Sequence, residues 1–322
     1  MKSVFHNEIE IFLMLREKTM KPKTCTMDRC ALHSFDQHLV KRGRKEKCIT
    51  EDDVSSWVQP MYNILSRNTI AGKIRTLRSF LTYIQTAGFK VYIPSYPKIQ
   101  DTYVPYLFSD SDIEKIFSAA DSVKLRKGTY RHLGLPMLLR MLYSCGFRLN
   151  ELLSIQIGDI DFQADTILLR NTKNEKQRIV PMHTALSEIL YRYCLAMNLL
   201  NSSKNFLFPS QNFEQHISCR AVEEWFEKLL KETGLYIRNK KHERGRCLHC
   251  FRHLFAIKSF AQAEHIGQST ANSIPYLSIY MGHSNLNETE KYLKFSSDIF
   301  PEHTSMFETY SEDIFPEVCY EK

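Results

Sequence analysis

The chain has 322 residues, 43% of them hydrophobic, which is enough for two domains that each bury a core. Residues 1–295 hold 42 basic and 29 acidic side chains, whereas residues 296–322 hold one and seven, and a basic body suits a polyanionic partner such as nucleic acid. Polar residues begin the chain and no apolar run reaches about 18 residues, which excludes a signal peptide or a membrane span and favours a cytoplasmic protein.

The first 90 residues predict four helices, near 5–18, 24–42, 51–65 and 68–86, because apolar side chains recur at helical spacing. The third helix begins at a capping pair, Thr50 and Asp53, and its apolar stripe runs from Val54 to Leu65. The fourth helix ends before Gly88. Four cations lie outside its apolar stripe: Arg67, Lys73, Arg75 and Arg78.

Residues 91–107 contain three prolines and predict a linker. A second capping pair, Ser109 and Asp112, opens a helix near 110–120. Further helices are predicted near 129–144, 184–198, 219–233, 248–263 and 273–281. Residues 165–170 and 178–182 predict a hairpin, with Lys173 in or beside its loop. The expected fold is mainly α-helical with a small antiparallel β-sheet.

Several short strings in the second half hold side chains suited to attack on a phosphodiester. They are Arg148, the pair His249 and Arg252 on one predicted helix face, and His283 followed nine residues later by Tyr292. Arginine binds phosphate oxygens through paired hydrogen bonds and stays charged. Tyrosine becomes a nucleophile when a base accepts its proton, and histidine can carry that proton.

Each of these residues also has a plainer interpretation. Arg148 can form a surface ion pair with Glu151 one helical turn later, and Tyr292 can be an ordinary core residue. Cys247, His249 and Cys250 resemble half of a zinc site, but no second pair of Cys or His at ligand spacing accompanies them. The nine cysteines follow no framework spacing and predict free thiols rather than disulfides.

The strings taken together resemble the tyrosine recombinase (phage integrase) family, over about residues 5–295. The most specific match is Gly-His-Ser-x-Leu-x-x-Thr-x-x-Tyr, which here runs from Gly282 to Tyr292. The resemblance implies a four-helix, SAM-like core-binding domain at 1–90, a linker at 91–107 and an α+β catalytic domain at 108–295. The chain is most similar to simple Xer-like or mobile-element members, because it begins directly with the helical bundle and an arm-binding domain is not expected.

The resemblance also implies a role for each residue. Tyr292 would form a 3′-phosphotyrosine with DNA, Lys173 would protonate the leaving 5′ oxygen, and Glu151 would orient an arginine. The remaining catalytic residues would be Arg148, His249, Arg252 and His283, and the cations of the fourth helix, Arg67, Lys73, Arg75 and Arg78, would contact DNA. No metal or other cofactor is implied. The implied partners are double-stranded DNA with paired half-sites and further copies of the chain, in a tetramer that forms and resolves a Holliday junction.

Three other functions stay open on the sequence. A topoisomerase-IB-like enzyme would rejoin the original ends with the same pocket, a DNA-bridging protein would need no intact catalytic set, and a zinc-bound regulator would hold stoichiometric metal. The acidic residues 296–322 repeat Asp-Ile-Phe-Pro-Glu at 298–302 and 313–317. They are expected either to dock on a neighbouring protomer, as the resemblance implies, or to form a disordered, solubilising tail.

Overall fold

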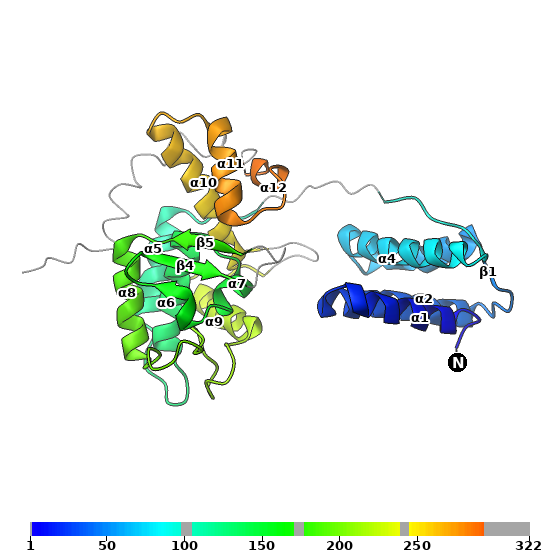
Figure 1. The fold of residues 1–322 in the computed structure, drawn as a ribbon, viewed down its shortest axis with the longest axis horizontal. Helices are drawn as coiled ribbons and strands as arrows, with labels where there is room; N and C mark the ends of the chain where they lie inside the picture. Colours follow the sequence, from blue (N-terminus) through cyan, green and yellow to red (C-terminus); the bar gives the residue numbers. More distant parts are fainter. Residues whose placement is uncertain (1, 98–104, 171–176, 239–244, 293–322) are drawn as a thin grey trace, which may run out of the picture. The chain divides into compact units, whose positions relative to one another are not determined.

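The computed structural model of the protein describes residues 2–97, 105–170, 177–238 and 245–292. The chain divides into two compact units, Met1–Tyr103 and Val104–Lys322. Both are built mainly from helices, and the second also contains a small antiparallel sheet, as the sequence predicted (Figure 1). Within the described residues, no helix combines the length and the apolar composition that a bilayer crossing needs.

The first unit is a helical bundle in which three long helices pack side by side (Figure 1). They are α1 (His6–Thr19), α2 (Pro22–Lys41) and α4 (Arg67–Thr86), joined by the shorter α3 (Glu51–Val58). Their shared core includes Ile9, Leu32, Phe35, Trp57, Leu77 and Phe80. Two short strands, β1 (Cys48–Ile49) and β2 (Lys90–Val91), pair in parallel and fix the chain after α4 beside the entry to α3.

The predicted helix at 51–65 is shorter in the structure. Its start is confirmed, because Thr50 and Asp53 form a capping box, but α3 ends at Val58 and a 3-10 helix, η1 (Gln59–Asn63), follows. Pro60 explains the change, since proline has no N–H to donate and its ring clashes with the carbonyl four residues earlier. The expected apolar stripe therefore stops early, and Ile64 is 65% exposed.

The second unit surrounds one central helix, α6 (Arg131–Cys145), which packs against α5, α8, α9 and α10. In chain order, the other helices of this unit are α5 (Asp110–Asp121), α7 (Leu149–Leu153), α8 (Thr184–Ala196), α9 (Cys219–Glu232), α10 (His249–His265), α11 (Thr270–Met281) and α12 (Asn287–Glu290). The predicted capping box between Ser109 and Asp112 is present at the start of α5. A further 3-10 helix, η2, covers Ile157–Asp159.

The small sheet has the order β3 (Ile160–Asp161), β4 (Thr166–Leu169), β5 (Arg178–Pro181), all antiparallel. The predicted hairpin is β4 and β5, with Leu169 opposite Arg178 and Thr166 opposite Pro181. Strand β3 was not predicted, because two residues are too few for an alternating pattern. Lys173 lies in the connection between β4 and β5, outside the described residues.

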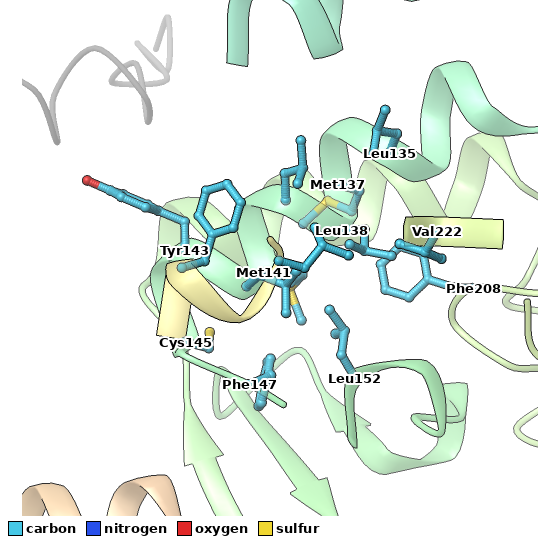
Figure 2. Close-up of a cluster of buried hydrophobic side chains, with 14 of the residues drawn as sticks. Leu135, Met137, Leu138, Met141, Tyr143, Cys145, Phe147, Leu152, Phe208 and Val222 are labelled. Atoms are coloured by element: carbon cyan, nitrogen blue, oxygen red, sulfur yellow. The ribbon is translucent and has the colours of Figure 1, made fainter. Parts of the chain in front are cut away.

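The core around α6 positions the turn that follows it. Leu138 and Met141 converge in Figure 2 with Phe147 and Leu152 from the next segment and with Val222 of α9. Gly146 ends the helix in the left-handed conformation, with φ of 60°, a geometry that glycine adopts without strain. Because Phe147 and Leu152 are anchored in this core, the segment between them is held at a defined place.

Candidate active site

Arg148 is held at the start of α7 by Glu151. It is the N-cap residue of that helix, and its Nη1 donates to Glu151 Oε1 at 2.7 Å. The same guanidinium lies 3.4 Å from the carbonyl oxygens of Met281 and Gly282, at the end of α11. The ion pair with Glu151 that was the plainer interpretation of Arg148 is therefore present, but it forms part of a larger cluster rather than an isolated surface pair.

Glu151 is shared with a second arginine, Arg178 of β5. Arg178 Nη2 donates to Glu151 Oε2 at 2.8 Å, and its Nε donates to the carbonyl of Tyr280 at 2.9 Å. Burial raises the pKa of Glu151, but hydrogen bonds and charge from Arg178 and then from Arg148 outweigh burial and leave that pKa below its usual value. The buried carboxylate thus stays ionised and ties β5, α7 and α11 together.

Arg252 is the most buried charged side chain of the site, with 1% of its surface exposed. Its Nη1 donates to the carbonyl of Gly146 and its Nη2 to the carbonyl of Met281, both at 2.7 Å. These carbonyls belong to the ends of α6 and α11, where helices carry unpaired acceptors and partial negative charge. Burial, and secondly repulsion from Arg148, lowers the pKa of Arg252 to about 10, so the guanidinium remains charged at neutral pH.

His283 follows the left-handed Gly282 that ends α11. Its Nε2 lies 3.0 Å from Arg252 Nη2, and its Nδ1 lies 2.7 Å from Thr289 Oγ1. A guanidinium can only donate, so Nε2 accepts and the proton of the neutral ring sits on Nδ1. Burial, followed by the charges of Arg252 and Arg148, lowers the pKa of His283 to about 4. The imidazole is therefore neutral at neutral pH.

Tyr292 lies beside two histidines, and a third histidine contacts one of them. Its ring centroid is 5.4 Å from that of His253 and 6.1 Å from that of His283, and the His253 ring is 4.7 Å from that of His249. Tyr292 is 6% exposed and belongs to the apolar cluster between α10 and α11. Burial raises its pKa, and the positive charge of Arg252 opposes that increase.

Four of the predicted catalytic residues therefore lie together with Glu151, and His249 is connected to them through the ring of His253. Arg148, Arg252 and His283 are linked by direct hydrogen bonds or shared carbonyl acceptors, and Tyr292 contacts the histidines. His249 is the first residue of α10 and is exposed. Lys173 falls outside the described residues.

The cations predicted on the fourth helix are all on α4, in the first unit. Arg67 and Arg75 are exposed, and Lys73 is partly exposed. Arg78 packs 4.2 Å over the ring of Tyr96 and donates to the carbonyl of Pro94. It therefore also holds the chain that follows the bundle.

Sequence reasoning missed Arg178 as a member of the site and gave Thr289 no role. The sequence placed Arg178 only at the start of a predicted strand, although its side chain is 11% exposed and bonds to Glu151. Thr289 is fully buried. Its place within the Gly282–Tyr292 string was the only signal available. In the parts of the chain that the structure covers, no three His, Cys, Asp or Glu side chains gather as metal ligands.

Comparison with known proteins identifies the pattern. A model of the phage integrase family matches residues 107–297. The putative integrase/recombinase y4rB of Sinorhizobium fredii is 31% identical over 212 residues, which cover 62% of this chain and 64% of that protein. The tyrosine recombinase XerC of Staphylococcus aureus is 26% identical over 272 residues, covering 83% of this chain and 84% of the relative.

The fold is also similar to that of solved structures. The XerH site-specific recombinase, bound to a palindromic difH substrate in a post-cleavage complex, superposes with a TM-score of 0.68 at 20% identity. The superposition covers 88% of this chain and 80% of that one. At this level of identity the likeness concerns the fold.

Proposed function

The chain belongs to the phage integrase family, and from that premise we propose how its own residues carry out the reaction. It is a site-specific tyrosine recombinase, an enzyme that breaks and rejoins DNA. The observation that carries the assignment of residues is the position of Arg252, which bonds the turn before Arg148, the end of α11 and His283 at once. Two cations, a neutral histidine and a tyrosine thereby share one small volume.

Arg148 and Arg252 bind the scissile phosphate in this proposal. A phosphodiester repels a nucleophile, and negative charge grows on its oxygens as the transition state forms. Two arginines fixed by Glu151 and by helix-end carbonyls favour that charge without first having to reorganise. His283 accepts from Arg252 through Nε2 and directs its Nδ1 proton at Thr289, so in this proposal it fixes the orientation of the Arg252 guanidinium.

Tyr292 is the nucleophile. Its phenolic oxygen forms a bond to phosphorus while the bond from phosphorus to the 5′ oxygen breaks, leaving a 3′-phosphotyrosine. The proton of the phenol passes to His249 in this proposal. The ring of His253 contacts both Tyr292 and His249 and so connects the two.

Lys173 acts as the general acid that protonates the leaving 5′ oxygen. Support comes from the family resemblance and from the position of Lys173 in the connection between β4 and β5. The first residue of β5, Arg178, bonds to Glu151, which in turn bonds to Arg148. The hairpin is thereby anchored at the pocket, and an extended connection of this length can reach a phosphate held there.

Rejoining follows when the 5′ hydroxyl of a partner strand attacks the phosphotyrosine, and two rounds form and resolve a Holliday junction. We infer that the helical domain at residues 1–90 and the catalytic domain bind one half-site together, with the α4 cations Arg67, Lys73, Arg75 and Arg78 near phosphates. Four copies would join two duplexes. Because the substrate is DNA, we also infer that the protein acts in the cytoplasm.

The test is the variant Tyr292→Phe, which removes only the attacking oxygen. A half-site duplex is first recovered by binding selection from random-sequence duplexes and is then nicked to trap the covalent product. We expect the variant to bind this duplex with unchanged affinity and to form no protein–DNA adduct in a denaturing gel. Tyr276→Phe is the matched control, because Tyr276 is 75% exposed on α11, and it should form the adduct normally. An adduct from Tyr292→Phe would refute the assignment.

A further inference from the structure

Two cysteines lie at the start of α10, immediately around a catalytic residue. Cys247 and Cys250 are three residues apart, and their Sγ atoms are 3.8 Å from each other. Cys250 is fully buried and Cys247 is partly exposed. His249 stands between them in the sequence and Arg252 follows two residues later. The proposed mechanism uses neither thiol.

The two sulfur atoms are in contact but not bonded. They would have to approach from 3.8 Å to about 2.05 Å, the length of a sulfur–sulfur bond. The turn between the two residues is already closed, because the backbone N–H of Cys250 donates to the carbonyl of Cys247 at 2.9 Å. The backbone N–H of Cys247 in turn points to Cys250 Sγ at 3.5 Å. Bond formation therefore requires a local adjustment and no rearrangement of the fold.

The two thiols differ in a way that suits stepwise oxidation. A hydrogen bond with Cys247, followed by burial, raises the pKa of Cys250, so that sulfur is protonated. Burial also keeps it away from solvent. Cys247 is the thiol that a dissolved oxidant can reach, because its side chain is partly exposed whereas Cys250 is fully buried. Cys247 is thus the site of first attack and Cys250 the resolving thiol.

We propose that Cys247 and Cys250 form a redox modification site, in which a disulfide made by a peroxide suppresses DNA cleavage and a thiol reductant restores it. The effect on cleavage rests on the proposed function. The disulfide would close a ring that contains His249, and the ring would pull on the first turn of the helix that also carries Arg252. A displacement of about 1 Å at a catalytic group can slow a reaction about a hundredfold.

The chemistry balances with the peroxide as the only added reagent. The Cys247 thiolate attacks one peroxide oxygen, the oxygen–oxygen bond breaks, and hydroxide leaves with a sulfenic acid on Cys247. The sulfur of Cys250 then attacks the Cys247 sulfur, the two sulfur atoms bond, and the sulfenic oxygen leaves as water with the Cys250 proton. Two electrons pass from the two thiols to the peroxide, and a dithiol reductant returns them.

The experiment treats the full-length protein with hydrogen peroxide, blocks the remaining thiols and maps disulfides by mass spectrometry of peptides. We expect a bond between Cys247 and Cys250 that dithiothreitol removes. On the selected, nicked half-site, oxidised protein should form adduct about a hundredfold more slowly than reduced protein, with recovery after reduction. Cys247→Ser should keep its cleavage rate in peroxide, whereas the control Cys30→Ser, at an exposed cysteine of α2, should remain sensitive.

Three results would overturn the proposal. They are the absence of a bond between these two cysteines, oxidised protein that cleaves as fast as the reduced protein, and peroxide sensitivity that persists in Cys247→Ser. Stoichiometric zinc released when both thiols are blocked would assign the pair to a metal instead. A reduced protein that forms no adduct would contradict the proposed function. The thiol site would then be decided by the disulfide map together with the imidazole resonances of His249, which should shift on oxidation.

Discussion

The buried carboxylate of Glu151 is stabilised by two arginines, Arg148 and Arg178, and in turn it orients both of them. Removing one partner of such a group leaves an uncompensated charge in a low-dielectric surrounding. Glu151 has both carboxylate oxygens occupied by guanidinium donors, so it is stable as an anion. The same contacts hold the guanidinium of Arg148 in a single orientation, which a residue that binds a transition state requires.

His283 predicts a specific dependence of stability on pH. Its pKa is lowered from 6.5 to about 4 in the folded protein, so between these values the unfolded chain binds the proton and the folded chain does not. The contribution of His283 to the free energy of unfolding is fully present above pH 6.5 and is lost as the pH falls toward 4. We therefore expect that the advantage of the wild type over His283→Asn in unfolding free energy, measured in urea, shrinks across this window.

The control for that measurement is His265→Asn, at an exposed histidine near the end of α10. This variant removes an exposed histidine, and the pH dependence of His283→Asn is compared with it over the same range. A difference for His283→Asn that is flat with pH would mean that His283 titrates alike in the folded and unfolded chains.

Lys173 predicts a rescue experiment. If it protonates the leaving 5′ oxygen, Lys173→Ala should cleave an ordinary phosphodiester at least about a hundredfold more slowly, a typical contribution of general acid catalysis. A substrate with sulfur in place of that oxygen should restore the rate, because a thiolate departs without a proton. Lys176→Ala serves as the comparison, and selective rescue of that variant instead would move the acid to the neighbouring lysine.

At the scale of elements, the site is an assembly of helix ends. Arg148 caps α7, His249 begins α10, and His283 follows the end of α11. Helix ends supply free backbone groups and partial charges, and Arg252 bonds two of these C-terminal carbonyls. The positions of the catalytic side chains therefore depend on where helices stop.

Gly282→Ala tests this dependence. Gly282 has φ of 66°, and a Cβ there would lie 2.6 Å from Arg178 Nη1, so alanine would both strain the backbone and displace Arg178 from Glu151. We expect a loss of roughly 1–2 kcal/mol in unfolding free energy from the left-handed backbone, together with a marked fall in adduct formation.

Gly267→Ala is the matched control, because Gly267 has φ of 78° and open space where its Cβ would be. Calorimetry should reveal a loss of stability from the backbone in both variants and a larger loss in Gly282→Ala, which also disturbs the bond of Arg178 to Glu151. The rate of adduct formation should fall only in Gly282→Ala. Equal cleavage by the two variants would show that the position of Arg178 beside Glu151 is not needed for cleavage.

At the scale of the whole molecule, the charge is divided along the chain. Residues 1–295 carry 42 basic and 29 acidic side chains, and residues 296–322 carry one and seven. An acidic segment is repelled by the DNA that the same protomer binds, but it is attracted to a basic protein surface. We propose that residues 296–322 dock on a neighbouring copy through the apolar pairs of the two Asp-Ile-Phe-Pro-Glu units.

A chain that ends after Ser296 tests this proposal. Half-site binding and single-site adduct formation should match the full-length protein, while recombination between two sites should fall roughly tenfold or more, since couplings between sites are typically of this size. Single-site cleavage is the internal control. Unchanged recombination by the shortened chain would leave residues 296–322 without a role in assembly.

The sequence by itself determined most of the helices, their capping boxes and the hairpin, and it proposed the residues of the site, because these depend on local spacing and on one specific string. Thr50 with Asp53 and Ser109 with Asp112 are three residues apart, and such contacts form whatever the rest of the chain does. Even here a single residue, Pro60, could overrule the apolar pattern.

Only the tertiary structure decided how those residues act. Arg252 reaches the carbonyl of Gly146 across 106 positions, and Arg178 reaches Tyr280 across 102. No periodicity in a sequence encodes such pairs, because they arise when separate helix ends meet around one core. Burial in that core sets the tautomer and the low pKa of His283 and encloses Tyr292, since the cost of removing charge from water depends on everything packed around it.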